Sequence, residues 1–234
     1  MEWIVRRLLH KINMIYNHRY NGRVDRTTAL AKIASLKNEI GESFTLIDVG
    51  GWAGSWVNEY HTHIVDIEKG DDPKVHYFTG NISNIGVWEE VLAYVKEHGK
   101  FDFCTCTHTL EDISGAMLAC EMLSRISEKG YIAVPSKYAE LRKLQENPQA
   151  FWRGWVHHRW IYDAVDGQFI GYPKIPLLEY SKEIDTWTEK NSQEGRVELE
   201  FFWANAINLK IINNDHLRPD VYSILDFYLR GLLT

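Results

Sequence analysis

The chain has 234 residues, of which 25% are charged and 45% are hydrophobic. This length and composition indicate a globular protein with a sizeable core and exclude intrinsic disorder. The formal net charge of −6 argues against a large nucleic-acid-binding surface, because such surfaces depend on Lys and Arg side chains that displace counterions. A small-molecule partner is therefore favoured.

Cysteine usage and hydropathy indicate the cellular compartment. The chain has three cysteines, and Cys104 and Cys106 share one apolar run, so we expect core packing for this pair and no disulfide framework. No apolar stretch approaches the roughly 20 residues of a membrane span, and the first 20 residues lack the features of a signal peptide. We expect a cytoplasmic protein that does not contact a membrane.

Residues 1–42 are expected to form a helical segment. An apolar stripe with helical spacing runs along its first turns, formed by Val5, Leu8, Leu9, Ile12, Ile15 and Tyr16. Such a stripe packs on a core or on a second copy of the chain. A homodimer would follow from the second case, and a helix lying on a membrane surface is the alternative.

Short apolar runs and helical patterns alternate over residues 43–145. The strand-like runs are 43–49, 63–67, 75–79, 101–107 and 131–134, and the helical patterns are 86–98 and 115–127. A β-α-β-α succession predicts an α/β fold with a Rossmann-like, doubly wound, mostly parallel sheet.

Residues 146–234 form an aromatic-rich extension of the same fold unit. Asp166-Gly167 between the runs 155–163 and 168–172 predicts a β-hairpin. The runs 196–203 and 207–212 are expected to form a second antiparallel pair. Pro219 then precedes a closing helix.

We expect this extension to bind a small-molecule substrate, either as a lid over the pocket or as an extension of the sheet. Its aromatic cluster consists of Trp152, Trp155, Trp160 and Tyr162. These side chains are expected either to wall a substrate or to pack in a core.

The strongest local motif is a glycine-rich turn after the first strand, Leu46-Ile-Asp48-Val-Gly50-Gly51-Trp52-Ala-Gly54-Ser-Trp56. Glycines allow the backbone to approach a ligand closely, and a helix beginning after the turn would offer free N–H groups to it. A strand, a turn and a helix in this order predict a site for a nucleotide-like ligand. A dinucleotide loop would read G-x-G-x-x-G, which this turn does not match.

Asp48, Gly50 and Gly54 resemble the first motif, D-x-G-x-G-x-G, of the class I S-adenosylmethionine-dependent methyltransferases, with Trp52 in place of the middle glycine. The run Phe101-Asp-Phe-Cys-Thr-Cys-Thr-His108-Thr-Leu-Glu111-Asp112 resembles the fourth-strand motif of the same superfamily. Together with Gly154-Trp-Val-His157-His158-Arg159-Trp160, it resembles a group of bacterial methyltransferase-domain proteins that combine H-T-L-E-D with H-H-R-W. The likeness to the superfamily covers about residues 43–136.

The resemblance implies that S-adenosylmethionine is the cofactor and methyl transfer the reaction. Asp66, at the end of the second strand, would bind the ribose, and Asn81 would lie beside the adenine. The full set of expected cofactor-binding residues is Asp48, Gly50, Gly51, Trp52, Gly54, Asp66, Ile67, Asn81, Ile82, Thr107, His108 and Leu110.

Methyl transfer to a hydroxyl needs alignment and a base, for which His157 and His158 are candidates, with Asp112 as an orienting carboxylate. His108 is a further candidate base. In a regular strand, His157 and His158 would point to opposite faces. Packing or hydrogen bonding without catalysis is the other interpretation of these histidines.

A divalent metal ion, Fe, Mn or Mg, is an alternative to a histidine base. Its candidate ligands are His108, Glu111, Asp112, His157 and His158. Glu111 and Asp112 could instead lie in the first turn of a helix, where its dipole favours acids.

The sequence thus predicts an O-methyltransferase for a small polyhydroxylated acceptor, such as a sugar or a sugar nucleotide, without a nucleic-acid partner. A non-catalytic S-adenosylmethionine-binding module is one alternative, because Trp52 replaces a loop glycine. A nicotinamide-dependent oxidoreductase is the other, because it also uses a Rossmann-like sheet.

Overall fold

A computed structural model of the chain describes residues 26–143, 152–191, 197–217 and 220–234. The apolar stripe expected within residues 1–25 and the helix start expected at Pro219 lie outside these ranges. Within them, a central six-stranded sheet has the strand order β3-β2-β1-β4-β5-β8. The expected α/β fold with a mostly parallel sheet is confirmed.

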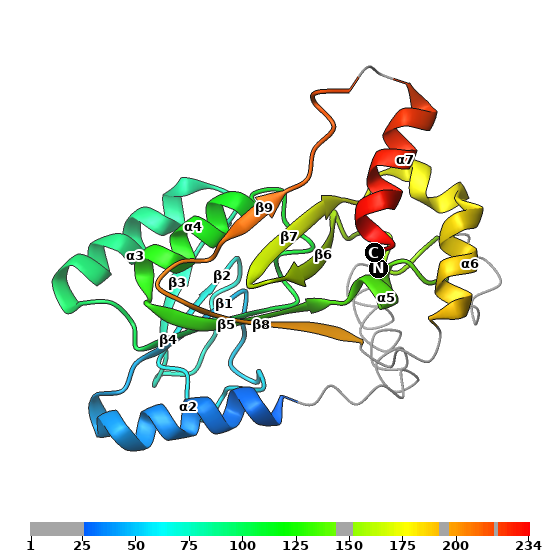
Figure 1. Ribbon diagram of the computed structural model, residues 1–234. Helices are drawn as coiled ribbons and strands as arrows, with labels where there is room; N and C mark the ends of the chain where they lie inside the picture. Colours follow the sequence, from blue (N-terminus) through cyan, green and yellow to red (C-terminus); the bar gives the residue numbers. More distant parts are fainter. Residues whose placement is uncertain (1–25, 144–151, 192–196, 218–219) are drawn as a thin grey trace, which may run out of the picture.

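Five strands of this sheet are parallel, and their positions agree with the strand-like runs of the sequence (Figure 1). They are β1 (Leu46–Val49), β2 (His63–Asp66), β3 (His76–Thr79), β4 (Phe103–Thr107) and β5 (Lys129–Pro135). The sixth strand, β8 (Glu198–Ala204), pairs with β5 in the antiparallel direction. The C-terminal extension therefore supplies one strand of the central sheet.

Helices cover both faces of the sheet (Figure 1). One face carries α3 (Ile85–His98) and α4 (Ala116–Ile126), which match the two helical patterns of the sequence, and the other face carries α2 (Thr27–Ile40). Successive strand residues alternate between the two cores: in β4, Cys104 packs with α3 and α4, whereas Phe103 packs with α2. This period of two is the reason why strands with both faces buried read as continuous apolar runs.

The expected hairpin is present as β6 (Trp160–Val165) and β7 (Gln168–Pro173), joined at Asp166-Gly167. Both turn residues have positive φ, 51° and 76°, as a two-residue hairpin turn requires. The hairpin packs on the central sheet through stacked rings, because Phe169 lies between Tyr162 and Phe201 at centroid distances of 4.6 and 5.0 Å.

The second antiparallel pair predicted for 196–203 and 207–212 is wrong. β8 pairs with β5, and β9 (Leu209–Ile211) pairs in parallel with β7 in a separate three-stranded sheet. At Asn205, with φ of 67°, the chain leaves the central sheet instead of turning back along it. Each of the two runs had a strand pattern, but their partners are distant in sequence.

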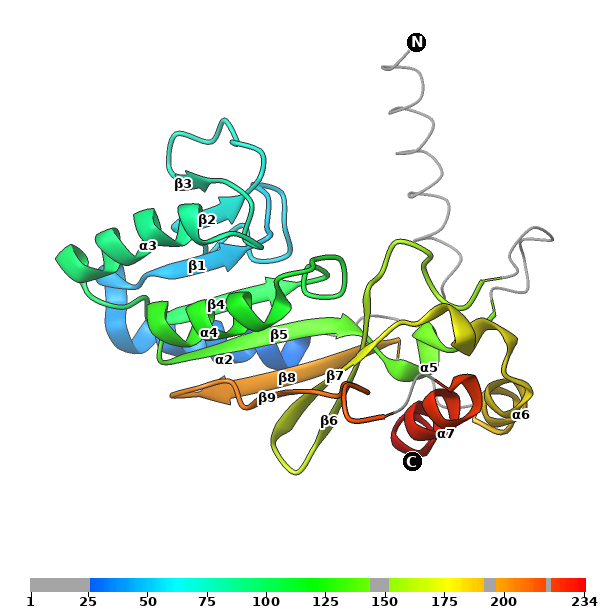
Figure 2. The ribbon, with the colours of Figure 1, turned by 90° about the horizontal axis from the view of Figure 1, so that it is seen from above.

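The remaining short helices lie beyond the carboxyl ends of the parallel strands (Figure 2). They are α5 (Lys137–Glu140), η2 (Pro176–Tyr180), α6 (Lys182–Lys190) and the expected closing helix α7 (Val221–Leu232). They share an apolar cluster with β6 and β7 that includes Leu141, Ile184 and Tyr228. None of the helices in the described ranges is long and apolar enough to cross a membrane.

Candidate functional site

The order of the strands reverses at one position of the central sheet. The chain moves from β1 to β2 and β3 on one side and then crosses to β4 on the other, so the order reverses between β1 and β4. In open α/β sheets, ligands bind outside the carboxyl ends of the strands at this reversal. The glycine-rich turn after β1 and the loop after β4 meet at this position.

The turn at Gly50-Gly51 is closely packed. Gly50 has φ of 73°, and a Cβ there would collide with the Thr109 side chain in the loop after β4. A Cβ at Gly51 would collide with the Asp48 carboxylate. The packing of the turn therefore requires a glycine at both positions. Because glycine has no side chain, the backbone of the turn can also be approached closely by a ligand.

Asp48 lies beneath this turn. Its side chain is 1% exposed, and its two oxygens accept hydrogen bonds from Thr105 Oγ1 at 2.7 Å and Ser55 Oγ at 2.9 Å. Burial raises the pKa of Asp48 to about 6, although the two hydroxyl donors oppose the shift. Asp48 thus fastens β1 to β4 and to the turn.

The helix expected after the glycine turn is absent from this described segment. Residues 53–60 form a series of turns, with Asn58 N donating to Ser55 O and His61 N donating to Val57 O. Gly54, Ser55 and Asn58 all have lower helix propensity than alanine, and only 13 residues separate β1 from β2. The glycine turn is therefore followed by further turns and not by a helix N-terminus.

The other expected cofactor residues lie along the same edge. Asp66 ends β2 beside the turn, is partly buried, and accepts a hydrogen bond from Glu68 N at 2.9 Å. Burial raises the pKa of its carboxyl. Ile67 and Trp52, which follow β2 and β1 in the chain, are 67% and 69% exposed, so most of the surface of these two large apolar side chains is free.

Five further positions make contacts within this chain. Asn81 Oδ1 accepts from Ser83 N at 2.8 Å in the turn after β3, whereas Ile82 is buried. Thr107 Oγ1, at the end of β4, accepts from Trp56 Nε1 at 3.3 Å. Leu110 is fully buried in the main core, so it fixes the loop after β4 by packing. Gly54 lies within the series of turns, against the Trp52 ring.

His108 belongs to a cluster of charged side chains. Its ring pairs with Glu198 of β8 through Nε2 and lies 3.3 Å from Glu111 Oε1 through Nδ1. Burial lowers the pKa of His108, but the two carboxylates outweigh this and raise it to about 9. A raised pKa favours the protonated imidazole, in which both ring nitrogens are hydrogen-bond donors to the two carboxylates.

Glu111 is the buried member of this cluster. It is 1% exposed, and within the described part of the chain neither of its oxygens accepts a hydrogen bond. The imidazolium of His108 is the charge that compensates it. Glu111 precedes α4 by several residues, so Glu111 and Asp112 belong to a loop and not to the first helical turn.

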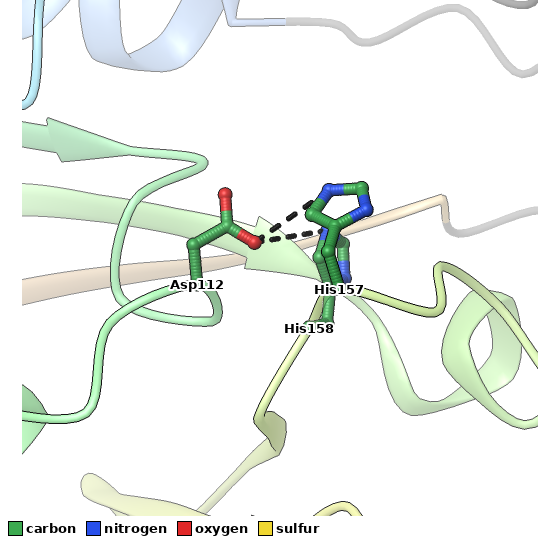
Figure 3. Close-up of side chains that lie close together, drawn as sticks. All are labelled: Asp112, His157 and His158. Atoms are coloured by element: carbon green, nitrogen blue, oxygen red, sulfur yellow. Dashed lines mark ion pairs between the residues drawn. The ribbon is translucent and has the colours of Figure 1, made fainter.

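Asp112, His157 and His158 converge on one point. The Nε2 atoms of both histidines lie 3.6 Å from the same oxygen, Asp112 Oδ1, and Figure 3 shows both rings approaching that oxygen. The three potential ligand atoms all lie within 4.8 Å of one another. Among the described residues, His108 and Glu111 do not join this group.

His157 and His158 would face opposite ways in a regular strand over residues 155–163, and this condition is not met. β6 begins only at Trp160, and Val156 and His157 form a turn. The alternation of a strand does not apply in a turn, so both rings can approach Asp112. The rings contact each other edge to face at 4.6 Å.

A buried ion pair supports His158 from behind. Glu140 of α5 is fully buried; its Oε1 accepts from His158 Nδ1 at 2.6 Å, and its Oε2 accepts from Lys174 Nζ at 2.7 Å. Trp155 stacks on His158 at 5.1 Å, so this ring of the aromatic cluster packs within the site. Neither Glu140 nor Lys174 belongs to a recognisable sequence motif, so the contacts that link them to His158 are evident only in the folded structure.

No protein-family model and no curated protein matches the sequence. The N-terminal domain of EvdMO1 with SAH bound is similar over 53% of this chain and 61% of its own, at 13% identity and a TM-score of 0.32. CalS10, an amino pentose methyltransferase from Micromonospora echinaspora, is similar over 66% of this chain and 65% of its own, at 16% identity and a TM-score of 0.32.

A SAM dependent methyltransferase from Archaeoglobus fulgidus is similar over 81% of this chain and 99% of its own, at 13% identity and a TM-score of 0.37. This chain spans about three fifths of the length of the EvdMO1 domain. Similarities of this size decide neither the fold nor the function, which rest on the strand order and the site of this chain itself.

Proposed function

We propose that the chain is an S-adenosylmethionine-dependent methyltransferase that O-methylates a small polyhydroxylated acceptor, such as a sugar or a sugar nucleotide. The observation that carries this proposal is the position of the Gly50-Gly51 turn at the reversal of strand order. Asp66 borders this turn on one side, and on the other the loop after β4 leads to Asp112. In our proposal, a nucleoside site and a proton-accepting site share one edge of the sheet.

The sheet favours a single nucleoside over a dinucleotide. Dinucleotide-binding sheets are built from two parallel halves in the order 3-2-1-4-5-6, whereas the sixth position here is taken by the antiparallel β8. In our proposal, the Asp66 carboxylate accepts hydrogen bonds from ribose hydroxyls, and Asn81, Ile82 and Ile67 border the base. The backbone of the turn and of residues 107–110 borders the remainder of the cofactor.

When bound, S-adenosylmethionine supplies a methyl group on a positively charged sulfur, which is itself the leaving group. This chain's residues must then orient an acceptor hydroxyl and remove its proton. The oxygen forms a bond to the methyl carbon while the carbon–sulfur bond breaks and its electron pair stays on sulfur. We assign the removal of this proton to Asp112, His157 and His158, which act either as a base or through a metal ion that they hold.

The surface around these residues supports a polyhydroxylated acceptor. Asp112 and His157 side chains are 42% and 62% exposed and offer oxygen and nitrogen acceptors to hydroxyl groups. Trp152 and Val156 are 48% and 69% exposed close by in sequence, and an aromatic face packs well against the apolar face of a sugar ring.

Calorimetric titration with S-adenosylmethionine, S-adenosylhomocysteine and NAD tests the cofactor. We expect both sulfur compounds to bind and NAD not to bind. Asp66→Ala removes a charged hydrogen-bond acceptor, which corresponds to about 10- to 100-fold weaker binding. Asp215→Ala is the matched control, because Asp215 is exposed and lies between β9 and α7. This variant should bind the cofactor like the unchanged chain.

NAD binding without binding of the sulfur compounds would replace the proposal by an oxidoreductase. Transfer of a labelled methyl group to a panel of sugars and sugar nucleotides then tests the acceptor class. Methylation only of amines or proteins contradicts O-methylation. Cofactor binding without any transfer favours a non-catalytic binding module.

A further inference from the structure

We infer that Asp112, His157 and His158 form a binding site for a divalent transition-metal ion, and that the buried pair Glu140 and Lys174 orients it. Binding of the ion is argued from the contacts of these five side chains alone. The use of the ion to activate an acceptor hydroxyl rests on the proposed methyltransferase function.

The distances within the group fit a shared ion better than hydrogen bonds. Each histidine Nε2 lies 3.6 Å from Asp112 Oδ1, which is too long for a hydrogen bond. An ion about 2.0–2.2 Å from each ligand atom bridges atoms separated by such distances. The two imidazoles and the carboxylate oxygen also lie within 4.8 Å of one another as a set of three.

Glu140 fixes the ring nitrogen that faces the site. An ionised carboxylate only accepts hydrogen bonds, so the 2.6 Å contact requires His158 Nδ1 to carry a proton. In the neutral ring, the Nε2 lone pair then points towards Asp112. A carboxylate that accepts from the outer nitrogen is the usual support of a metal-binding histidine.

Lys174 compensates the buried charge of Glu140. Its Nζ donates to Glu140 Oε2 at 2.7 Å and to the Trp155 carbonyl oxygen at 2.7 Å. A fully buried carboxylate without such a partner would be costly. Lys174, Glu140 and His158 thus form a series of polar contacts that ends at Asp112.

The ligand set also indicates the class of ion. Two imidazoles and one carboxylate favour Fe²⁺, Mn²⁺, Co²⁺ or Zn²⁺ over Mg²⁺ and Ca²⁺, which prefer oxygen ligands. Three protein ligands leave open coordination positions, the arrangement of catalytic and not of structural sites. An ion held by these three side chains would lower the pKa of an acceptor hydroxyl at the site, and water would take up the released proton.

Titration of the chelator-treated full chain with MnCl₂, followed by calorimetry and by the loss of the free-ion electron paramagnetic resonance signal, tests the inference. We expect one ion per chain. His157→Ala, which changes an exposed side chain, and Asp112→Asn should each weaken binding at least 10-fold. Glu140→Gln should weaken it 10- to 100-fold, as removal of a supporting carboxylate does.

His98→Ala is the matched control, since this exposed histidine lies at the end of α3, and it should bind Mn²⁺ like the unchanged chain. A hundredfold excess of MgCl₂ should not displace Mn²⁺. Absence of Mn²⁺ binding, or equal binding by His157→Ala and the unchanged chain, overturns the metal site. Equal binding by folded Glu140→Gln overturns the orienting role of Glu140.

The two proposals fail separately. Titration of the same preparations with S-adenosylhomocysteine shows whether the cofactor binds. Cofactor binding without Mn²⁺ binding leaves the methyltransferase proposal with a histidine base and removes the metal. Mn²⁺ binding without cofactor binding removes the methyltransferase proposal and keeps the metal site.

Discussion

His63 is a histidine held in its neutral form by the core of β2. It is 6% exposed, and its ring contacts Phe101 at 4.8 Å and Tyr94 at 4.9 Å. Burial, followed by the charges of His76 and His98, lowers the pKa of His63 to about 4. An unfolded chain takes up this proton near pH 6.5, so His63 opposes folding as the pH falls from about 6.5 to 4.

We expect His63→Phe to flatten the acid side of the stability profile, because phenylalanine keeps the ring packing and cannot be protonated. The change should remove a slope of up to about 1.4 kcal/mol per pH unit between pH 6.5 and 4. Urea unfolding at pH 4.5, 5.5 and 7 measures it. His216→Phe, at an exposed position, is the control, and an unchanged slope in His63→Phe refutes the assignment.

The loop after β4 is positioned by the segment that enters β6. Arg159 N donates to Glu111 O at 2.6 Å, Trp160 Nε1 donates to Ile113 O at 2.8 Å, and Tyr162 OH donates to Leu110 O at 3.1 Å. These bonds fix Asp112 relative to the two histidines that precede β6. One element thus holds both halves of the candidate site.

Tyr162→Phe should lower the free energy of unfolding by about 1 kcal/mol, because one buried hydrogen bond is lost while the ring packing remains. Chemical denaturation measures the loss. Tyr222→Phe changes a side chain that is 82% exposed and should have no effect. Equal stability of the two variants would show that the bond to Leu110 does not stabilise the loop.

Gly50→Ala should destabilise the chain by several kcal/mol and abolish cofactor binding. The residue has positive φ and no room for a Cβ beside Thr109. Gly86→Ala is the matched control, since it lies in α3 with no atom near the added carbon, and it should be neutral or stabilising. Thermal unfolding and calorimetry of both variants test this, and normal binding by Gly50→Ala contradicts the role of the turn.

At the scale of elements, local pattern predicted the strands and helices whose apolar periodicity is continuous, such as β4 and α4. It also predicted the hairpin, because Asp166-Gly167 determines a turn within two residues. It could not predict the partners of β8 and β9, because strand pairing depends on distant residues. It also placed the start of β6 too early and expected a helix after Gly50.

The candidate site was predictable only in the residue types that it brings together. The sequence indicated Asp112, His157 and His158 as candidate site residues. It gave no means to decide that these three converge and that His108 and Glu111 do not join them, because the direction of a side chain depends on tertiary contacts. The role of Glu140 was not predictable, because a buried carboxylate is recognised only through its neighbours.

At the scale of the whole molecule, Glu198 joins three distant parts of the chain. It accepts from Arg26 at 2.6 Å, just before α2, and pairs with His108 after β4. Burial raises the pKa of Glu198, but His108 and Arg26 outweigh this effect and lower it. The ion pairs hold β8 and the loop after β4 at one edge of the sheet.

Stability should fall as the pH rises through 9, because the pKa of His108 is raised to about 9. The contribution of its charge is complete below about pH 6.5 and is lost as the folded form deprotonates. His108→Asn, which tolerates the positive φ, should remove this dependence, whereas His216→Asn should keep it. Unfolding free energies at pH 6.5, 8 and 9.5 measure the effect, and a flat profile in the unchanged chain contradicts it.

The position of β8 has a consequence for engineering. The three-stranded sheet and its helices are interrupted in sequence by a strand that belongs to the central sheet. A chimera that exchanges residues 152–234 as one block would also replace the sixth strand and its contacts to β5. An exchange of the extension between related chains that keeps the central sheet intact therefore needs two inserts, placed before and after Glu198–Ala204, with the strand of the recipient left in place.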